Sequence, residues 1–167
     1  CDRKKHGGVC WGYPFPWQAR AFFVPLGTPN LITTVYVAKA LYALRQAGAG
    51  YRFVDAAISA GLYLGEQHYE ARGGGAFYRY IPGESVLVHN ANLWGAATVC
   101  RAATESGRTH YLNGVKAAVA TSLEAQAEDG SWRYGERHHH AFVDGFHTGY
   151  NLEALSDLQD VWGDERY

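Results

Sequence analysis

The sequence contains no methionine among its 167 residues, and it begins with Cys1 followed by a charged run. A complete chain starts with methionine, so we expect this one to be a piece of a longer protein. Long apolar runs are also absent, and none approaches the roughly 18 to 20 residues that a helix needs to cross a membrane. The first residues lack the apolar core of a secretory signal peptide, although a signal could lie upstream. We therefore expect no membrane span in this sequence.

An excess of positive charge is missing as well. Fifteen Lys and Arg stand against sixteen Asp and Glu, which gives a formal net charge of -1. The longest cationic run is Arg3-Lys4-Lys5, whereas a nucleic-acid backbone requires a basic stripe or patch. The composition, with 47% hydrophobic and 19% charged residues, is typical of one packed soluble domain. We predict a single domain over residues 1–167 and no nucleic-acid partner.

Cysteine is scarce, with Cys1, Cys10 and Cys100 the only three. Their odd number and the lack of any CxxC spacing fit a reducing compartment in which thiols fill small apolar spaces. These features predict a cytoplasmic location.

Motifs for metals and cofactors are also lacking. Three consecutive histidines, His138-His139-His140, cannot all face one ion, and no paired spacing supports them, so we expect a solvated loop. The run Gly73-Gly74-Gly75 lacks the Lys-Ser that follows in a phosphate-binding loop, so we expect a flexible loop tip. We therefore assign no cofactor and no metal.

What the sequence does contain is a repeated helical pattern, in which apolar spacing marks each helix and glycine ends it. The first unit begins at Thr28-Pro29-Asn30, where Thr28 is the expected cap and Pro29 suits the first turn. This helix ends at 48–50, and a second helix follows over about 53–66. The two helices form a predicted αα-hairpin over about 28–66.

A second unit repeats this plan over about 90–126. Asn90 or Asn92 is the expected cap of its first helix, which ends at Ser106-Gly107. A third unit starts near 146 and contains one helix only. Long loops at 6–28, 67–89 and 127–146 would then emerge on one side of the stack.

The first helix of each unit is rich in alanine and nearly apolar all round, which is typical of a helix buried on both sides. Stacked hairpins with such an inner layer curve into a solenoid or close into a ring. We favour the ring. The predicted fold is all-α, with repeated αα-hairpins forming part of an (α/α) toroid.

A resemblance supports this ring. The segment Gln126-Ala127-Glu128-Asp129-Gly130-Ser131-Trp132 resembles the QxxDGSW repeat of terpenoid cyclases and prenyltransferases, which are α/α toroids. A wider pattern resembles bacterial toroid proteins from polysaccharide-biosynthesis neighbourhoods, and it includes residues 10–20, 88–92, 132–136 and 146–149. The sequence has neither the DxDD acid motif of protonating cyclases nor the Asp, Cys and His zinc set of prenyltransferases.

The resemblance implies a glycan-related function, because six-hairpin glycosidases, lyases and sugar epimerases share the ring architecture. We therefore expect a carbohydrate-binding protein of polysaccharide metabolism, with an oligosaccharide or polysaccharide as its substrate. Carbohydrate processing by hydrolysis, elimination or epimerisation is compatible with this resemblance. Two alternatives stay open. One is an isoprenoid-handling toroid, and the other is a non-catalytic glycan-binding scaffold. A shared fold alone does not establish function.

Four side chains are candidate acid–base groups: Asp144, His147, His89 and Glu136. Glycoside hydrolysis commonly uses two carboxylates, and Glu136 and Asp144 flank one loop. The two histidines stand at predicted helix starts, where the neutral imidazole is favoured and can act as a base. Each of these residues has an alternative role. Glu136 would be a surface charge or form an ion pair with Arg133 or Arg137, and Asp144 would be an N-cap. Each histidine would be a buried group bonded to a loop carbonyl.

The predicted substrate-binding residues combine aromatic rings with polar groups: Trp11, Tyr13, Trp17, Arg20, Asn90, Asn92 and Tyr134. Aromatic rings stack on the apolar faces of sugars, and Trp11 and Trp17 are the strongest candidates. Loop aromatics also serve simply to pack a loop, and this alternative is strongest for Trp132, which would close its turn against the preceding helix. The two asparagines are expected to be caps first and ligand contacts second.

Overall fold

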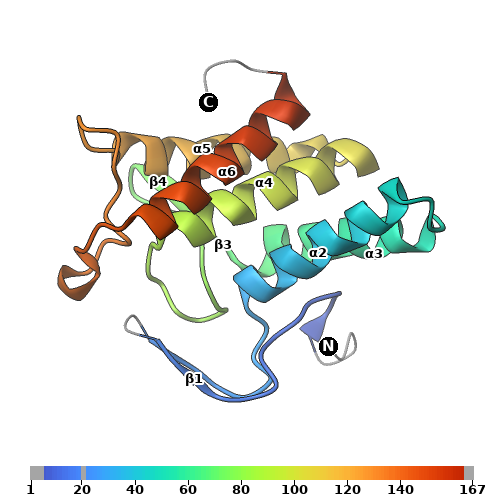
Figure 1. Cartoon of the computed structure of the whole chain (residues 1–167), viewed down its shortest axis with the longest axis horizontal. Coiled ribbons are helices and arrows are strands. Elements are labelled where there is room, and N and C mark those ends of the chain that lie inside the picture. Colours follow the sequence, from blue (N-terminus) through green and yellow to red (C-terminus); the bar gives the residue numbers. More distant parts are fainter. Residues whose placement is uncertain (1–5, 20–21, 164–167) are drawn as a thin grey trace.

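The computed structural model describes residues 6–19 and 22–163. It is mostly helical, with two small two-stranded sheets (Figure 1). Its long helices are α2 (Leu31–Gln46), α3 (Arg52–Gln67), α4 (His89–Ser106), α5 (Leu112–Glu124) and α6 (Gly145–Trp162). The apolar periodicity predicted each of these helices to within a few residues of its ends.

Helix α4 lies at the centre of the molecule and packs against α2, α3, α5 and α6. In α4, 14 of the 18 residues are buried, which confirms the prediction of a helix buried on both sides. The same prediction is wrong for α2, which buries only five of its 16 residues. Glycines allow the neighbours of α4 to approach it closely. A Cβ at Gly61 of α3 would lie 2.4 Å from the Cβ of Ala102, and one at Gly95 of α4 would lie 2.8 Å from Leu31.

Helices α2 and α6 both pack against α4 and are joined to each other by ion pairs. The Nζ of Lys39 on α2 lies 2.9 Å from a carboxylate oxygen of Asp157 and 3.1 Å from one of Glu153, both on α6. The same Nζ lies 3.8 Å from the ring centroid of Trp94 on α4. These contacts connect segments that are far apart in the chain.

Two of the predicted helix caps are wrong. Asn30, not Thr28, caps α2, because its Oδ1 accepts a hydrogen bond from the backbone N–H of Thr33 at 2.8 Å. Helix α4 begins at His89 after Val88, and neither Asn90 nor Asn92 caps it. The first turn of α4 is buried and has no side-chain cap. Its His89 N–H donates instead to the Tyr134 carbonyl at 3.0 Å.

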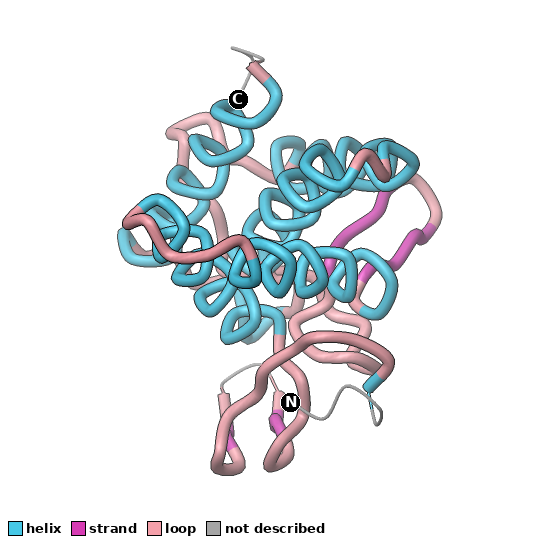
Figure 2. The backbone as a smooth tube through the Cα atoms, turned by 90° about the vertical axis from the view of Figure 1, so that its right-hand side faces the viewer, coloured by secondary structure: helices cyan, strands magenta, loops and turns pink. Residues whose placement is uncertain are grey.

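The loop predicted over 67–89 contains a β-hairpin that the sequence pattern did not reveal. Strand β3 (Tyr69–Arg72) pairs antiparallel with β4 (Gly75–Tyr78), so the glycine run forms a tight turn with Gly74 at φ +91°. Figure 2 shows this hairpin beside the helices. The second sheet pairs β1 (Trp17–Gln18) with β2 (Phe23–Val24) and lies in the N-terminal loop. The chain is therefore mostly, but not entirely, helical.

The turn at Gln126–Trp132 is closed by its own residues. The Nε2 of Gln126 donates to the Gly130 carbonyl at 2.9 Å, and Asp129 accepts from the backbone N–H and hydroxyl of Ser131. Gly130 has φ +83°, a conformation that favours glycine. The indole of Trp132 is buried and donates to the Ser122 carbonyl at 2.7 Å. The predicted packing role of Trp132 is therefore confirmed.

Two interpretations based on single residue types need correction. Cys10 is disulfide-bonded, so it is not a free thiol, whereas Cys100 is free and buried. Disulfides are typical of oxidising compartments, so the bond at Cys10 bears against the cytoplasmic location, which stays a prediction. The histidine run is a short 3-10 helix, His138–His140, in which His140 is fully buried. It is therefore not the wholly solvated loop that was expected.

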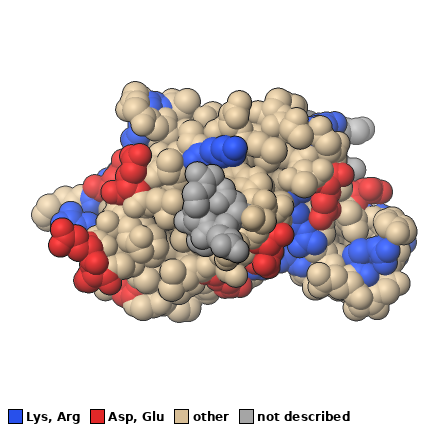
Figure 3. Space-filling model, turned by 90° about the horizontal axis from the view of Figure 1, so that it is seen from above, with Lys and Arg blue, Asp and Glu red and all other residues tan. Residues whose placement is uncertain are grey.

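In the described part of the chain, no helix combines the length and the apolar character that crossing a membrane requires. On the face shown in Figure 3, positive and negative side chains are interspersed among uncharged ones.

Candidate functional site

An aromatic cleft of about 600 Å³ lies where three loops meet the start of α6. Its lining comes from the N-terminal loop, the segment after β4, the loop before α6 and α6 itself. The residues are Tyr13, Trp17, Ala19, Tyr80, Tyr134, Phe142, Asp144 and His147. Five of them, Tyr13, Trp17, Tyr134, Asp144 and His147, were predicted as site residues from the sequence.

Asp144 and His147 form a bonded pair at this cleft. Asp144 is the N-cap of α6, and its Oδ1 accepts from the backbone N–H of His147 at 2.7 Å. The imidazole Nδ1 of His147 lies 2.8 Å from Oδ2 and 3.0 Å from Oδ1 of the same carboxylate. The predicted alternative role of Asp144 as a cap is therefore confirmed, and the carboxylate contacts the imidazole as well.

This geometry determines which nitrogen of His147 is available. A carboxylate only accepts hydrogen bonds, so Nδ1 carries the proton and Nε2 keeps its lone pair in the neutral ring. Partial burial acts to raise the pKa of Asp144, but hydrogen bonds from the backbone and imidazole of His147 outweigh it, and the pKa is held below its ordinary value. An ionised Asp144 therefore orients His147 as a hydrogen-bond acceptor or base through Nε2.

Aromatic rings surround the imidazole. The His147 ring lies edge-on to Tyr134, with centroids 4.7 Å apart, and Phe146 is 5.5 Å away. At the outer end, Trp17 is 46% exposed and its ring lies 6.2 Å from that of Tyr13. Such rings offer stacking surfaces to the apolar face of a ligand.

Two phenol groups of the cleft, those of Tyr80 and Tyr134, stay protonated at neutral pH. The hydroxyls of Tyr13 and Tyr80 are 3.1 Å apart and share a hydrogen bond. Burial, with smaller contributions from Tyr13 and Asp144, raises the pKa of Tyr134 to about 12. Burial also raises the pKa of Tyr80 well above its usual value, with the hydrogen bond to Tyr13 as the next cause. The site therefore combines one basic imidazole with several O–H donors.

A smaller cavity of about 210 Å³ adjoins the cleft, and Tyr80, Tyr134 and His147 line both. Its other walls come from the three helices α2, α4 and α6: Ile32, Tyr36, Asn90, Trp94, Phe146 and Tyr150. We call it the inner cavity. Asn90 is 7% exposed, and its buried Oδ1 has no hydrogen-bond partner.

Two predicted acid–base residues take part in other contacts. His89 is buried, with Nδ1 3.0 Å from the Ser122 hydroxyl, and desolvation lowers its pKa to about 4 against a small opposing effect of Glu136. Glu136 accepts from the Leu87 backbone N–H at 2.9 Å and pairs with Arg72, instead of the neighbouring arginines that we expected. Neither residue lines the cleft or the inner cavity.

Two predicted substrate-binding residues, Asn92 and Trp11, also make other contacts. Asn92 is fully buried and bonds the Tyr78 N–H, the Ala118 carbonyl and the Ser122 hydroxyl, so it joins elements of the fold. Trp11 packs against a separate apolar cluster that includes Ala38 and does not line the cleft. Arg20 lies outside the described residues.

Sequence reasoning missed the helical part of the site, namely Tyr36, Trp94 and Tyr150. Aromatic residues at helical spacing are usually core residues, so nothing local distinguishes these three. Their rings meet only after folding, because the centroid of Trp94 is 5.7 Å from that of Tyr36 and 6.2 Å from that of Tyr150. Phe142 was also missed, although it stands within the aromatic loop before α6.

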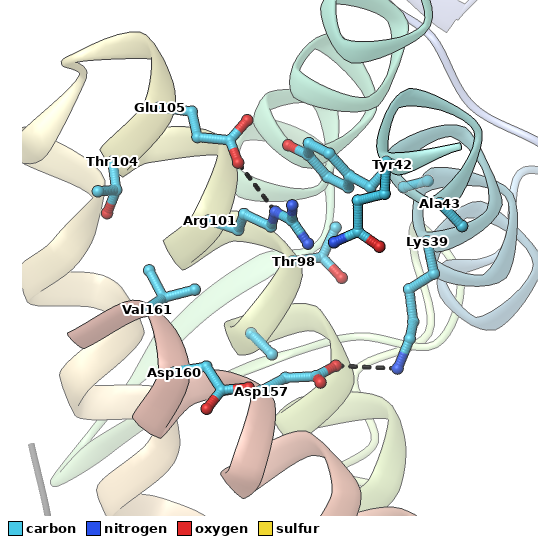
Figure 4. A pocket seen from close by; sticks show the side chains of 13 residues that line it. Lys39, Tyr42, Ala43, Thr98, Arg101, Thr104, Glu105, Asp157, Asp160 and Val161 are labelled. Carbon is cyan, nitrogen blue, oxygen red and sulfur yellow. Dashed lines mark hydrogen bonds and ion pairs between the residues drawn. The ribbon is translucent and has the colours of Figure 1, made fainter. Parts of the chain in front are cut away.

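A third hollow, of about 590 Å³, lies between α2, α4 and α6 and is lined by charged residues (Figure 4). Most of these charges are already paired. Lys39 reaches Asp157, while Arg101 bonds Glu105 at 2.9 Å and lies 3.6 Å from the ring centroid of Tyr42. A ligand would have to replace these contacts, so the aromatic cleft is the stronger candidate site.

Among the residues that the structure describes, no group of three or more His, Cys, Asp or Glu side chains is placed to hold a metal ion. Comparison with known proteins finds no matching family model, no matching curated protein and no matching solved structure. The interpretation of the site therefore depends on its own geometry.

Proposed function

We propose that the aromatic cleft binds a carbohydrate chain and that His147 acts in it as a general base. The observation that supports this most is the bonded pair of Asp144 and His147 within walls of tyrosine and tryptophan. Exposed Trp17 offers a stacking platform, while the imidazole lies deeper beside Tyr134. The cleft thus offers a stacking surface close to a reactive group.

The chemistry of the cleft favours one type of reaction. Its described lining contains a single carboxylate, Asp144, which is already bonded to His147. Hydrolysis by two carboxylates needs a second acid, and Glu136 is paired elsewhere. One imidazole oriented by a carboxylate, together with phenol O–H donors, suits removal of a proton from a sugar and donation of another, as in elimination or epimerisation.

We further propose that the chain is part of an α/α toroid of polysaccharide metabolism. The packing of α2 with α3, of α4 with α5, and of α4 with both α2 and α6 supports a stack of paired helices. The turn at Gln126–Trp132, which resembles the toroid repeat, forms a closed unit against the end of α5.

Turnover assays on acidic and neutral polysaccharides test the proposal. Elimination creates new reducing ends together with a conjugated double bond that absorbs ultraviolet light, whereas hydrolysis creates reducing ends alone. We expect His147→Gln to lower kcat by about 10²- to 10⁴-fold, the usual contribution of a general base. Asp144→Asn should also lower kcat. Because asparagine caps a helix as well as aspartate does, this change separates imidazole orientation from helix capping.

The matched control is His138→Gln, since His138 is exposed and does not line the cleft. It should leave kcat unchanged. Full turnover by His147→Gln would rule out the general base. Glycan binding without turnover by the wild type would indicate a non-catalytic scaffold, and thermal stabilisation by prenyl diphosphates alone would replace the carbohydrate by an isoprenoid.

A further inference from the structure

We propose that the inner cavity is a subsite for the acetamido group of an N-acetylated sugar. The inference rests on the proposed carbohydrate function and specifies the substrate class. The inner cavity adjoins the cleft through Tyr80, Tyr134 and His147, so a group held there belongs to a sugar next to the imidazole. Its volume of about 210 Å³ is below the usual range for a whole ligand, so it takes one substituent or one ring.

Asn90 provides the polar contact. Its side chain is more than nine-tenths buried, and its Oδ1 has no hydrogen-bond partner. A buried amide oxygen without a partner costs about 1–3 kcal/mol, so such a group usually has a partner in the working protein. The oxygen is an acceptor, and a ligand must supply an N–H or O–H donor to satisfy it.

The walls distinguish between these two donors. Trp94 is buried between the rings of Tyr36 and Tyr150, and Ile32 and Phe146 add further apolar surface. A lone hydroxyl would satisfy Asn90 but would gain little from these rings. An acetamido group presents an N–H to the Asn90 oxygen and a methyl group to the aromatic surface, so both parts of the cavity are used.

The carbonyl of that acetamido group also has candidate donors. Tyr36 and Tyr150 are neighbours in the inner cavity, and burial followed by a hydrogen bond with Tyr150 raises the pKa of the Tyr36 phenol. One hydroxyl proton of this pair lies between the two phenols, and the other hydroxyl can donate to the ligand carbonyl. By contrast, the described lining of the inner cavity contains no Lys or Arg, so nothing there favours a carboxylate or sulfate over a neutral substituent.

Isothermal titration of the whole chain with chitotriose and cellotriose tests the subsite, because these trisaccharides differ in having an acetamido group or a hydroxyl. We expect chitotriose to bind at least about tenfold more tightly, a difference of about 1.4 kcal/mol. Asn90→Leu should abolish this preference, because it should weaken chitotriose binding more than cellotriose binding. Asn113→Leu is the matched control, since Asn113 is exposed on α5 and lines neither cavity, and it should keep the preference.

The outcomes separate the two proposals. Binding of both trisaccharides with equal affinity, or a preference that survives in Asn90→Leu, would overturn the acetamido subsite but leave carbohydrate binding intact. Failure of every sugar to bind would overturn the proposed function and the subsite together. Asn90→Ala provides a second variant that adds no bulk, and circular dichroism confirms that each variant is folded before titration.

Discussion

At the scale of single residues, two asparagines show how one residue type takes opposite roles within a turn of α4. Asn92 bonds three groups on two other elements, β4 and α5, whereas the oxygen of Asn90 bonds none. Both residues lie near the start of the helix, and each was predicted to be a cap first and a ligand contact second. Only the neighbours brought in by the fold distinguish them, because no local pattern records where Tyr78 or Ser122 will lie.

This difference predicts opposite stability effects. Asn92→Leu removes three hydrogen bonds and leaves the buried Tyr78 N–H without its side-chain partner, so we expect a loss of about 2–4 kcal/mol in the free energy of unfolding. Asn90→Leu removes a buried oxygen that has no hydrogen-bond partner, so its free energy of unfolding should equal that of the wild type or exceed it by up to about 1–3 kcal/mol. Urea titrations followed by circular dichroism measure both. Equal losses would show that Asn90 has a structural role.

Buried histidines predict a second residue-scale effect, on pH dependence. Desolvation lowers the pKa of both His68 and His89 to about 4. In the unfolded chain each binds a proton below about pH 6.5, whereas in the fold each stays neutral until about pH 4. Stability is therefore fully present above pH 6.5 and falls as pH drops toward 4, by on the order of 3 kcal/mol for each histidine.

Urea unfolding at several pH values between 7 and 4.5 measures this slope. His89→Gln should flatten it by about half, whatever its effect on stability at pH 7, and His68→Gln should do the same. The exposed His138 provides the control, since His138→Gln should leave the slope unchanged. A slope that is the same in all four proteins would contradict the assignment.

At the scale of elements, the long helices were predictable from the sequence, whereas the short strands and the cap of α2 were not. Apolar residues repeat with helical spacing over a dozen or more positions, and glycines such as Gly107 end them at positive φ. The strands β3 and β4 have four residues each, which is too short for a periodicity to emerge, and the adjacent glycines resembled a loop. The cap at Asn30 was missed because Thr28 and Pro29 fit the same local rule.

Glycines within the helices give an element-scale prediction. Gly61→Ala places a Cβ 2.4 Å from Ala102 and 2.8 Å from the Thr98 carbonyl oxygen, so α3 must move away from α4, and we expect a loss of about 1–3 kcal/mol. Gly149→Ala on α6 meets nothing within 4 Å and should increase stability by about 0.5–1 kcal/mol, because alanine favours the helix. Thermal melts compare the two. A stabilised Gly61→Ala would show that α3 and α4 are less closely packed.

At the scale of the whole molecule, the site could be predicted only where its residues stand in loops. Tyr13, Trp17, Tyr134, Asp144 and His147 belong to aromatic or acidic loop segments, which the sequence marks clearly. The inner cavity is built from helix surfaces that meet across long stretches of chain. The inner cavity exists only because α2, α4 and α6 are packed in this relative arrangement. That arrangement depends on contacts between distant segments, so no single segment predicts it.

Exposed apolar side chains predict the behaviour of the isolated chain. Leu44 on α2 is 45% exposed and Leu152 on α6 is 54% exposed, as is expected if further hairpins of a ring cover these helices. We expect the 167-residue chain to self-associate, with an average mass that rises with concentration in sedimentation velocity experiments. Leu44→Lys combined with Leu152→Lys should reduce this rise. A wild-type chain that stays monomeric at high concentration would contradict the prediction.

The ion pair between Lys39 and Asp157 joins positions 118 residues apart, and the cleft likewise needs both the N-terminal loop and α6. Contacts of such separation form late, since the entropy of closing a long loop must be overcome first. The binding site is therefore completed only when α6 docks. A ligand bound in the cleft would contact the start of α6 and stabilise its docked position. We therefore expect ligand binding to slow amide hydrogen exchange most strongly in α6.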